Sequence, residues 1–306
     1  GPKEMQIEVV DNCSNKDDPE SLIKDFSGGR VSFYRQPHNV GAIQNFNTCI
    51  ERSFGQIVHI LHSDDLVLPG FYNHLREAFE KEPTIGAAFC RHIIVDEERH
   101  LRYLLPLERS EPGVLTGLLE RIAVKQLIYP AGIVVRRSSY EKLGGFHLEL
   151  IHAGDWEMWK RIAAHYPVWY EPQPLACYRV HSSSITSQLI RSGVNIGDCR
   201  RAIEISQSYL PDATAGELSD KAREFYALLA INGARQKLAL YNMGAVLAHI
   251  REALKCSHSL RVTKSVVRFF VGLQEPSVFR LVVKLLFGER GTKVIKRMSN
   301  LVSHRD

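Results

Sequence analysis

The stretch that most constrains the fold is the apolar run Ile57-Val58-His59-Ile60-Leu61, followed at once by His62-Ser63-Asp64-Asp65. The run predicts a buried β-strand, so the two carboxylates lie where a strand ends and a loop begins. In an open parallel sheet, ligands bind outside the carboxyl ends of the strands. The pair therefore indicates either a divalent-cation site that holds phosphates, or a surface turn whose Asp residues cap the next helix.

Strand and helix patterns alternate over the first 190 residues. Strands are predicted at 6–10, 31–35, 57–61, 85–95, 131–135 and 168–180. Helices are predicted at 19–26, from Gly41 to about 54, and at 70–82, 114–124, 138–143 and 154–165, while the charged segment 97–112 is expected to be a loop. Such alternation is typical of parallel βαβ units with right-handed crossovers.

From about residue 195 onward the strand patterns stop. Helices are predicted at 195–209, 215–240, 243–256, 262–273, 277–287 and 291–302. The predicted fold is therefore α/β, with a mixed, mainly parallel, Rossmann-like sheet flanked by helices over residues 1–190 and an all-helical region over 191–306. A chain of 306 residues is long enough to build a substantial core in each part.

Positive charge is concentrated in the helical region. The whole chain carries +5, but residues 251–306 hold 12 Lys and Arg against 4 Asp and Glu. Such a tail suits an anionic surface, and the alternative is a solvated helical face. The apolar stretches 264–271 and 279–287 contain interspersed Arg and Lys. They suit interfacial helices on an anionic membrane, or helices packed on the α/β region or on a second protomer as a homodimer.

The cysteine pattern predicts a cytoplasmic protein. The six cysteines are scattered without a Cys-x-x-Cys pair, which favours reduced thiols over a disulfide framework or a zinc site. There is no secretory signal pattern and no apolar run of about 18 residues. The alternative, given the basic tail, is peripheral association with the inner face of the cell membrane.

Further polar residues follow other predicted strands or open helices. Asp11 and Asn12 follow the first strand and suit either a ligand edge or an Asx turn. Gly41 allows a positive φ or a close approach of backbone to ligand. Asp155 stands at the start of a helix, where a simple N-cap, worth about 1 kcal/mol, is the alternative to a chemical role.

Six motifs in order carry a resemblance to a known family. They are Val-Asp-Asn-x-Ser from Val10, Asn-x-Gly-x-x-x-Asn from Asn39, Ser-Asp-Asp-x-x-x-Pro from Ser63, Gly-Gly-Phe from Gly144, Asp-Trp-x-x-Trp from Asp155 and Tyr-Arg-x-His from Tyr178. Each motif alone is weak. In this order, over residues 6–187, the chain resembles the family 2 glycosyltransferases with a GT-A fold.

The resemblance implies a nucleotide-diphosphate sugar donor bound by residues from four segments, one of which contributes Asp64. Asp11 and Asn12 match the position that contacts the nucleobase. The loop bordering the nucleotide corresponds to Asn39, Gly41 and Asn45. Arg179 matches the segment that closes over the pyrophosphate.

The resemblance also implies transfer with inversion at the anomeric carbon. Asp155 matches the catalytic base, and Asp64 and Asp65 match the end of the motif that coordinates Mn²⁺ or Mg²⁺ on the diphosphate. His181 is expected to be a further metal ligand. A divalent ion would neutralise the leaving diphosphate, and a carboxylate would take the proton of the acceptor hydroxyl. A glycan or lipid-linked acceptor and a role in polysaccharide biosynthesis are the family-level expectation, with no nucleic-acid partner.

Three positions depart from the family pattern. His62 stands where an Asp is usual, which puts the metal requirement in question because imidazole is a softer ligand than carboxylate. Gly154 replaces an acidic residue before Asp155. The usual first strand is absent, so we expect the native protein to carry a further central strand. A complete central sheet formed by residues 6–306 alone would contradict that expectation.

Two other functions remain open. One is a GT-A-like nucleotidyltransferase, and the other is a non-catalytic binding module on a transferase scaffold. A dinucleotide oxidoreductase is disfavoured because no Gly-x-Gly-x-x-Gly follows a strand.

Overall fold

The computed structural model describes residues 5–240 and 242–271. The strands are β1 (Glu8–Asp11), β2 (Ser32–Arg35), β3 (Ile57–Val58), β4 (Leu66–Val67), β5 (Ala87–Val95), β6 (Leu101–Leu104), β7 (Gly113–Val114), β8 (Ile133–Arg136) and β9 (Val168–Arg179). In the first 180 residues the helices are α1 (Pro19–Ser27), α2 (Ala42–Arg52), α3 (Phe71–Lys81), α4 (Leu118–Val124), the short η1 (Pro130–Gly132), α5 (Arg137–Leu143) and α6 (Gly154–His165). The predicted elements are found within a few residues of their expected bounds. Strands β4, β6 and β7 were not predicted; β6 lies in the segment 97–112, which was expected to be a loop, and forms a hairpin with β5.

The sheet is mixed, as predicted, but the expectation of mainly parallel pairing is wrong. Along the path β3-β8-β5-β9-β4 of the larger sheet, β5 and β9 are the one parallel pair. The separate two-stranded sheet of β1 and β2 is also parallel. The reason is the place of β8, which pairs antiparallel with both β3 and β5. Strands β3 and β5 thus run in the same direction, as their βαβ connection requires, but β8 separates them.

The β-structure is divided between two sheets. In the described part of the chain, β1 and β2 form a two-stranded sheet that shares no ladder with the seven-stranded sheet. A cavity lined by residues 5–10 and 55–61 lies between β1 and β3. The described residues thus do not form the complete central sheet that would have contradicted the expectation, and the further strand stays a prediction.

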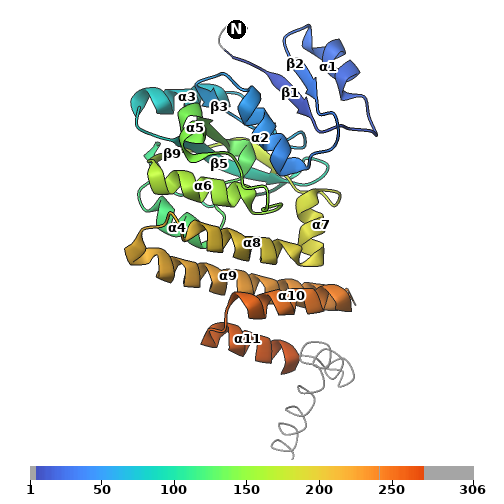
Figure 1. The fold of residues 1–306 in the computed structure, drawn as a ribbon, viewed down its shortest axis with the longest axis vertical. Coiled ribbons are helices and arrows are strands. Elements are labelled where there is room, and N and C mark those ends of the chain that lie inside the picture. Colours follow the sequence, from blue (N-terminus) through green and yellow to red (C-terminus); the bar gives the residue numbers. More distant parts are fainter. Residues whose placement is uncertain (1–4, 241, 272–306) are drawn as a thin grey trace, which may run out of the picture.

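Most of the C-terminal helices pack in layers beneath α6, and the first of them lies to one side (Figure 1). They are α7 (Ile185–Ser192), which was not predicted, α8 (Val194–Ser206), α9 (Asp212–Ala239), α10 (Met243–Cys256) and α11 (Leu260–Val271). One hydrophobic cluster runs through both regions and includes Trp156 of α6, Ile196 of α8 and Tyr226 of α9. The division at residue 190 stays a prediction, and the shared core shows that the two parts are packed together.

The position of helix α11 distinguishes between the membrane-bound and the packed alternatives for the stretch 264–271. Its apolar residues Val262, Val266 and Phe269 are buried against the other helices, so this face is packed within the chain. The other apolar stretch, 279–287, and the helices predicted at 277–287 and 291–302 lie outside the described residues. Across the described residues, none of the helices has the length and hydropathy that a membrane span needs.

Candidate active site

Strand pairing brings the acidic loop beside the end of β9. Leu66 of β4 pairs with Cys177 of β9 in antiparallel register, so Asp64 and Asp65 lie next to the residues that follow Cys177. The backbone N–H of Arg179 donates to Asp65 Oδ1 at 3.0 Å. His181 Nε2 lies 2.9 Å from Asp64 Oδ2. The two segments that the family resemblance linked are thus in direct contact, 114 or more residues apart in sequence.

Asp65 is buried, and one of its carboxylate oxygens accepts no hydrogen bond from the described residues. Its residue exposure is 5%, and burial is the main cause that raises the pKa of its carboxyl to about 7. Oδ2 has no hydrogen-bond partner among the described residues. Such an orphan is costly unless something outside the protein pairs with it.

A bound cation would pair with Asp65 Oδ2. Ligand atoms of His62, Asp64 and Asp65 lie within 4.8 Å of one another. Burial lowers the pKa of His62, which keeps the imidazole in the neutral form that binds metals. His62 is also held in place by stacking on Phe46, with ring centroids 4.7 Å apart. The donor set of two carboxylates and one imidazole suits Mn²⁺ and is acceptable for Mg²⁺.

Asp155 lies in the first turn of α6 and is held by two donors. Trp156 N–H donates to Oδ1 at 2.7 Å, and Gln126 Nε2 donates to Oδ2 at 3.0 Å. Burial nevertheless raises the pKa of the carboxyl to about 7, and the negative charge of Asp198 adds to the rise. A carboxylate with this pKa is suited to accept a proton near neutral pH.

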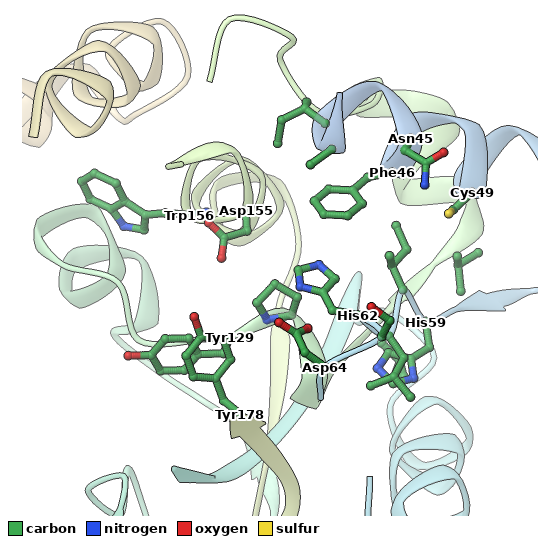
Figure 2. A pocket seen from close by; sticks show the side chains of 18 of the residues that line it. Asn45, Phe46, Cys49, His59, His62, Asp64, Tyr129, Asp155, Trp156 and Tyr178 are labelled. Carbon is green, nitrogen blue, oxygen red and sulfur yellow. Dashed lines mark hydrogen bonds between the residues drawn. The ribbon is translucent and has the colours of Figure 1, made fainter. Parts of the chain in front are cut away.

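One cavity connects these groups. It has a volume of about 1740 Å³ and is lined by His62, Asp64 and Asp155 among others. Figure 2 shows Asp155 on one wall, with His62 and Asp64 on the neighbouring wall and Tyr129 and Tyr178 beside them. The rings of Tyr129 and Tyr178 stack at 4.5 Å and form an aromatic floor. This volume exceeds that of a typical single-ligand pocket, and it leaves room for a nucleotide sugar together with an acceptor.

The residues predicted to border the nucleotide are placed differently. Asn45 lines the cavity, but among the described residues Asp11, Asn12, Asn39 and Gly41 are not in its wall. They hold the β1 and β2 loops together: Asn12 Oδ1 accepts from Val40 N–H at 2.9 Å, and Asn39 Oδ1 accepts from Gly41 N–H at 3.0 Å. Gly41 has φ +83°, the positive value allowed by its missing side chain.

Asp11 is engaged with neighbours as well. Burial would raise the pKa of its carboxyl, but hydrogen bonds from Ser14 and the guanidinium of Arg35 at 2.9 Å outweigh burial and hold it below its usual range. Among the predicted site residues, the structure therefore brings together Asp64, Asp65, Arg179 and His181, with Asp155 and Asn45 in the same cavity as Asp64. Their roles stay predictions.

Sequence reasoning missed Gln126, Tyr129 and Asp198. Gln126 and Tyr129 follow α4 and reach the site through the tertiary fold, and Asp198 reaches it from α8. None of the three stands in a motif, and each becomes visible only when α4, α6 and α8 are packed.

The first half of the chain resembles a known protein family. Residues 1–144 match the family model described as glycosyl transferase family 2. This part of the chain is similar to the family 2 glycosyltransferases. The predicted resemblance is thereby confirmed, and the family match supports glycosyl transfer.

Relatives and solved structures agree with the family match. An uncharacterized protein of Mycobacterium tuberculosis is 25% identical over 211 residues, and an uncharacterized glycosyltransferase of Rickettsia typhi is 23% identical over 187 residues. The alignments cover 65% and 60% of this chain and 66% and 58% of those relatives. The chain thus spans only part of the length of the relatives it matches.

Among solved structures, S. aureus TarS 1–349 in complex with UDP-GlcNAc has a TM-score of 0.65 at 14% identity, covering 87% of this chain and 76% of that one. A mannosyltransferase from Pyrobaculum calidifontis in complex with GDP-Man and Mn²⁺ has a TM-score of 0.53 at 17% identity, covering 94% and 80%. At these identities the likeness concerns the fold, and the GT-A fold class is confirmed.

Proposed function

We propose that this protein transfers a sugar from a nucleotide-diphosphate sugar to an acceptor hydroxyl, with inversion at the anomeric carbon and with Mn²⁺ or Mg²⁺ bound. One observation carries the proposal. A carboxylate with a pKa near 7, Asp155, lines the same cavity as His62 and Asp64. These two residues form a cluster with the buried Asp65, and the neutral imidazole of His62 and the unpaired Oδ2 of Asp65 suit a cation.

The residues on the two walls of the cavity have different proposed roles. His62, Asp64 and Asp65 would hold the cation, which, when bound, would neutralise the charge of the departing diphosphate. His181, bonded to Asp64, would orient that carboxylate. Asp155 would take the proton from the acceptor hydroxyl. Gln126 and the Trp156 amide aim its two oxygens, so it needs no reorganisation at the moment of transfer.

The acceptor side of the cavity has a different chemistry. Ile185 and Ile190 of α7 and Phe225 and Leu229 of α9 line it, and each is between 37% and 57% exposed. Exposed apolar side chains beside a base favour an acceptor that joins a hydroxyl-bearing sugar to an apolar group, such as a lipid-linked glycan. Polysaccharide biosynthesis, a cytoplasmic location, peripheral membrane association and dimerisation through the C-terminal helices belong to the same proposal.

The test begins with donor binding. Thermal shift is measured with UDP, GDP, CDP and dTDP, each with and without Mn²⁺ or Mg²⁺, on the wild type and on Asp65→Asn. A nucleotide at a hundredfold its Kd adds about 2.7 kcal/mol to stability, which gives an easily measured shift. We expect a cation-dependent shift with one nucleotide that is lost in Asp65→Asn.

The chain offers a matched control in a second cluster. Asp96, Glu98 and His100 also place ligand atoms within 4.8 Å of one another, but on the exposed β5–β6 turn. Asp96→Asn should leave the nucleotide shift unchanged. A flat response of the wild type to all four nucleotides, or an equal loss in Asp96→Asn, contradicts the donor site.

The second stage identifies the reaction. With the matching nucleotide sugar and a glycoside acceptor, a sugar transferase releases nucleoside diphosphate. A nucleotidyltransferase instead forms or consumes a nucleoside triphosphate and pyrophosphate. Asp155→Asn should bind the donor nucleotide normally and lose transfer by at least about 10²-fold. Normal donor binding without turnover in the wild type would favour the non-catalytic scaffold.

A further inference from the structure

The start of α6 is held by a residue from another helix. The N-cap position of α6 is Ala153, whose side chain cannot cap, and no side chain caps it locally among the described residues. Instead Asp198 of α8 accepts three consecutive backbone N–H groups. Its Oδ2 lies 2.7 Å from His152 N and 2.7 Å from Ala153 N, and its Oδ1 lies 3.3 Å from Ile151 N.

These bonds have the features of strong ones. Asp198 is 9% exposed, so little water competes for its oxygens. Hydrogen bonds to an ionised acceptor are shorter and about twice as strong as neutral ones. A carboxylate at a helix N-terminus also interacts favourably with the helix dipole. Ala153 lies two residues before Asp155, so the bonds fix the backbone from which the base projects.

Other buried contacts fix α6 against α8 along its length. Lys160 Nζ donates to Ala202 O at 3.2 Å and to Ser206 Oγ at 3.0 Å. Tyr209, just beyond α8, donates its hydroxyl to Glu157 O at 3.2 Å. The helix that carries Asp155 is therefore located by α8 both at its start and along its body, rather than by the sheet alone.

We propose that Asp198 is a positioning residue for the base Asp155, and that the C-terminal helical region is thereby part of the catalytic unit. This inference rests on the proposed role of Asp155. It assigns to α8 a function in the transfer step, in addition to any role in membrane association or dimerisation.

The charge of Asp198 also acts on Asp155. Besides His62, which lines a small pocket with Asp155 and whose pKa burial lowers, the titratable groups that face Asp155 from the packed elements are Asp198 and Cys199 of α8, Tyr226 of α9, Tyr129 before η1 and Tyr178 of β9. The four other than Asp198 are thiol or phenol groups whose pKa burial raises, so they are neutral near pH 7. Removing the charge of Asp198 should therefore lower the pKa of Asp155.

The experiment compares Asp198→Ala and Asp198→Asn with the wild type and with Asp220→Asn, a matched charge removal on α9 at a side chain that is 81% exposed. The first readout is amide hydrogen exchange of a peptide covering residues 150–158, which needs no activity. The second is donor-nucleotide affinity, and the third is kcat with the pH profile of kcat/KM.

In Asp198→Ala, we expect the amide hydrogens of residues 151–153 to exchange with solvent at least tenfold faster than in the wild type. Its kcat should fall about 10²-fold, the scale of a 1 Å misplacement, with the nucleotide Kd within twofold of wild type. Asp198→Asn keeps the size of the side chain and one acceptor oxygen, and it covers the case in which the alanine variant does not fold. It should give a smaller loss of kcat and shift the acid limb of kcat/KM to lower pH. Asp220→Asn should match the wild type throughout.

Two results would overturn the inference. One is unchanged exchange at 151–153 in the folded Asp198 variants. The other is faster exchange with kcat and the pH profile unchanged, which would make the contact merely structural. If the wild type transfers no sugar, the proposed function fails, whereas the exchange comparison still decides whether Asp198 orders the segment that carries Asp155.

Discussion

Replacing Asp155, the proposed base, should stabilise the protein at high pH and abolish the proposed sugar transfer. Burial raises the pKa of Asp155 from 3.8 to about 7. The folded protein thus keeps this proton over a range in which the unfolded chain has lost it. The contribution of Asp155 to stability is full below about pH 4 and is lost as pH rises through about 7.

The size of the effect follows from the shift. At 1.36 kcal/mol per unit, the full shift corresponds to roughly 4 kcal/mol. The side chain is only half-buried and borders the cavity, where water screens its charge, so we expect about 1–2 kcal/mol. Asp155→Asn removes this cost. It also loses one bond, because a single amide oxygen replaces two acceptors that serve Trp156 and Gln126, at about 1 kcal/mol independent of pH.

The pH dependence separates the two contributions. Urea unfolding of wild type and Asp155→Asn is measured at pH 4 and at pH 8.5. The variant should gain about 1–2 kcal/mol relative to wild type between the two pH values, or roughly 2–4 °C in Tm per kcal/mol. The exposed control Asp220→Asn should show a difference of less than about 0.5 kcal/mol. Equal differences between Asp155→Asn and wild type at both pH values would refute the reasoning that burial tunes this carboxylate.

Four further outcomes are expected. The wild-type kcat/KM should rise with pH up to about 7, because Asp155 must lose its proton to act as a base, and a pH profile flat from 5 to 8 would contradict this. Asp65→Asn should weaken nucleotide binding in the presence of Mn²⁺ at least about tenfold by calorimetry, with little change when the cation is removed by chelation. Burial lowers the pKa of Lys160 to about 7, so its contribution to stability is full above about pH 10.5 and is lost as pH falls through about 7. Lys160→Met should therefore gain stability relative to wild type as pH falls from 10 to 7, as thermal unfolding at both pH values would show. Asn47→Ala should cost about 1–3 kcal/mol in urea unfolding, because Asn47 bonds both Phe146 N at 2.7 Å and Phe146 O at 3.0 Å.

The identity of most elements and part of the site were predictable from the sequence. Apolar runs and helical periodicity are local signals, and they located the strands near 8–11, 87–95 and 168–179 and the start of α6. The motif order correctly linked the acidic loop to Arg179 and His181. Those positions are visible because the chemistry needs particular side chains at the ends of particular strands.

Strand pairing and the supporting residues were decided by the tertiary structure. An antiparallel β8 between β3 and β5 leaves no local signature, since pairing depends on segments more than 40 residues apart. Asp11, Asn12 and Asn39 are polar turn residues in sequence, and only the fold shows that they bond one another's loops outside the cavity wall.

The burial that sets the chemistry is also a tertiary property. Asp155 and Asp65 are ordinary carboxylates in the sequence, and their raised pKa values arise because packed helices and strands remove water from around them. The three amides that Asp198 caps lie 45 or more residues before it, so no spacing rule could connect them. The sequence determined which groups are available for the proposed transfer, and the packing of α6 against α8 decided how Asp155 is held and over which pH range its carboxyl loses its proton.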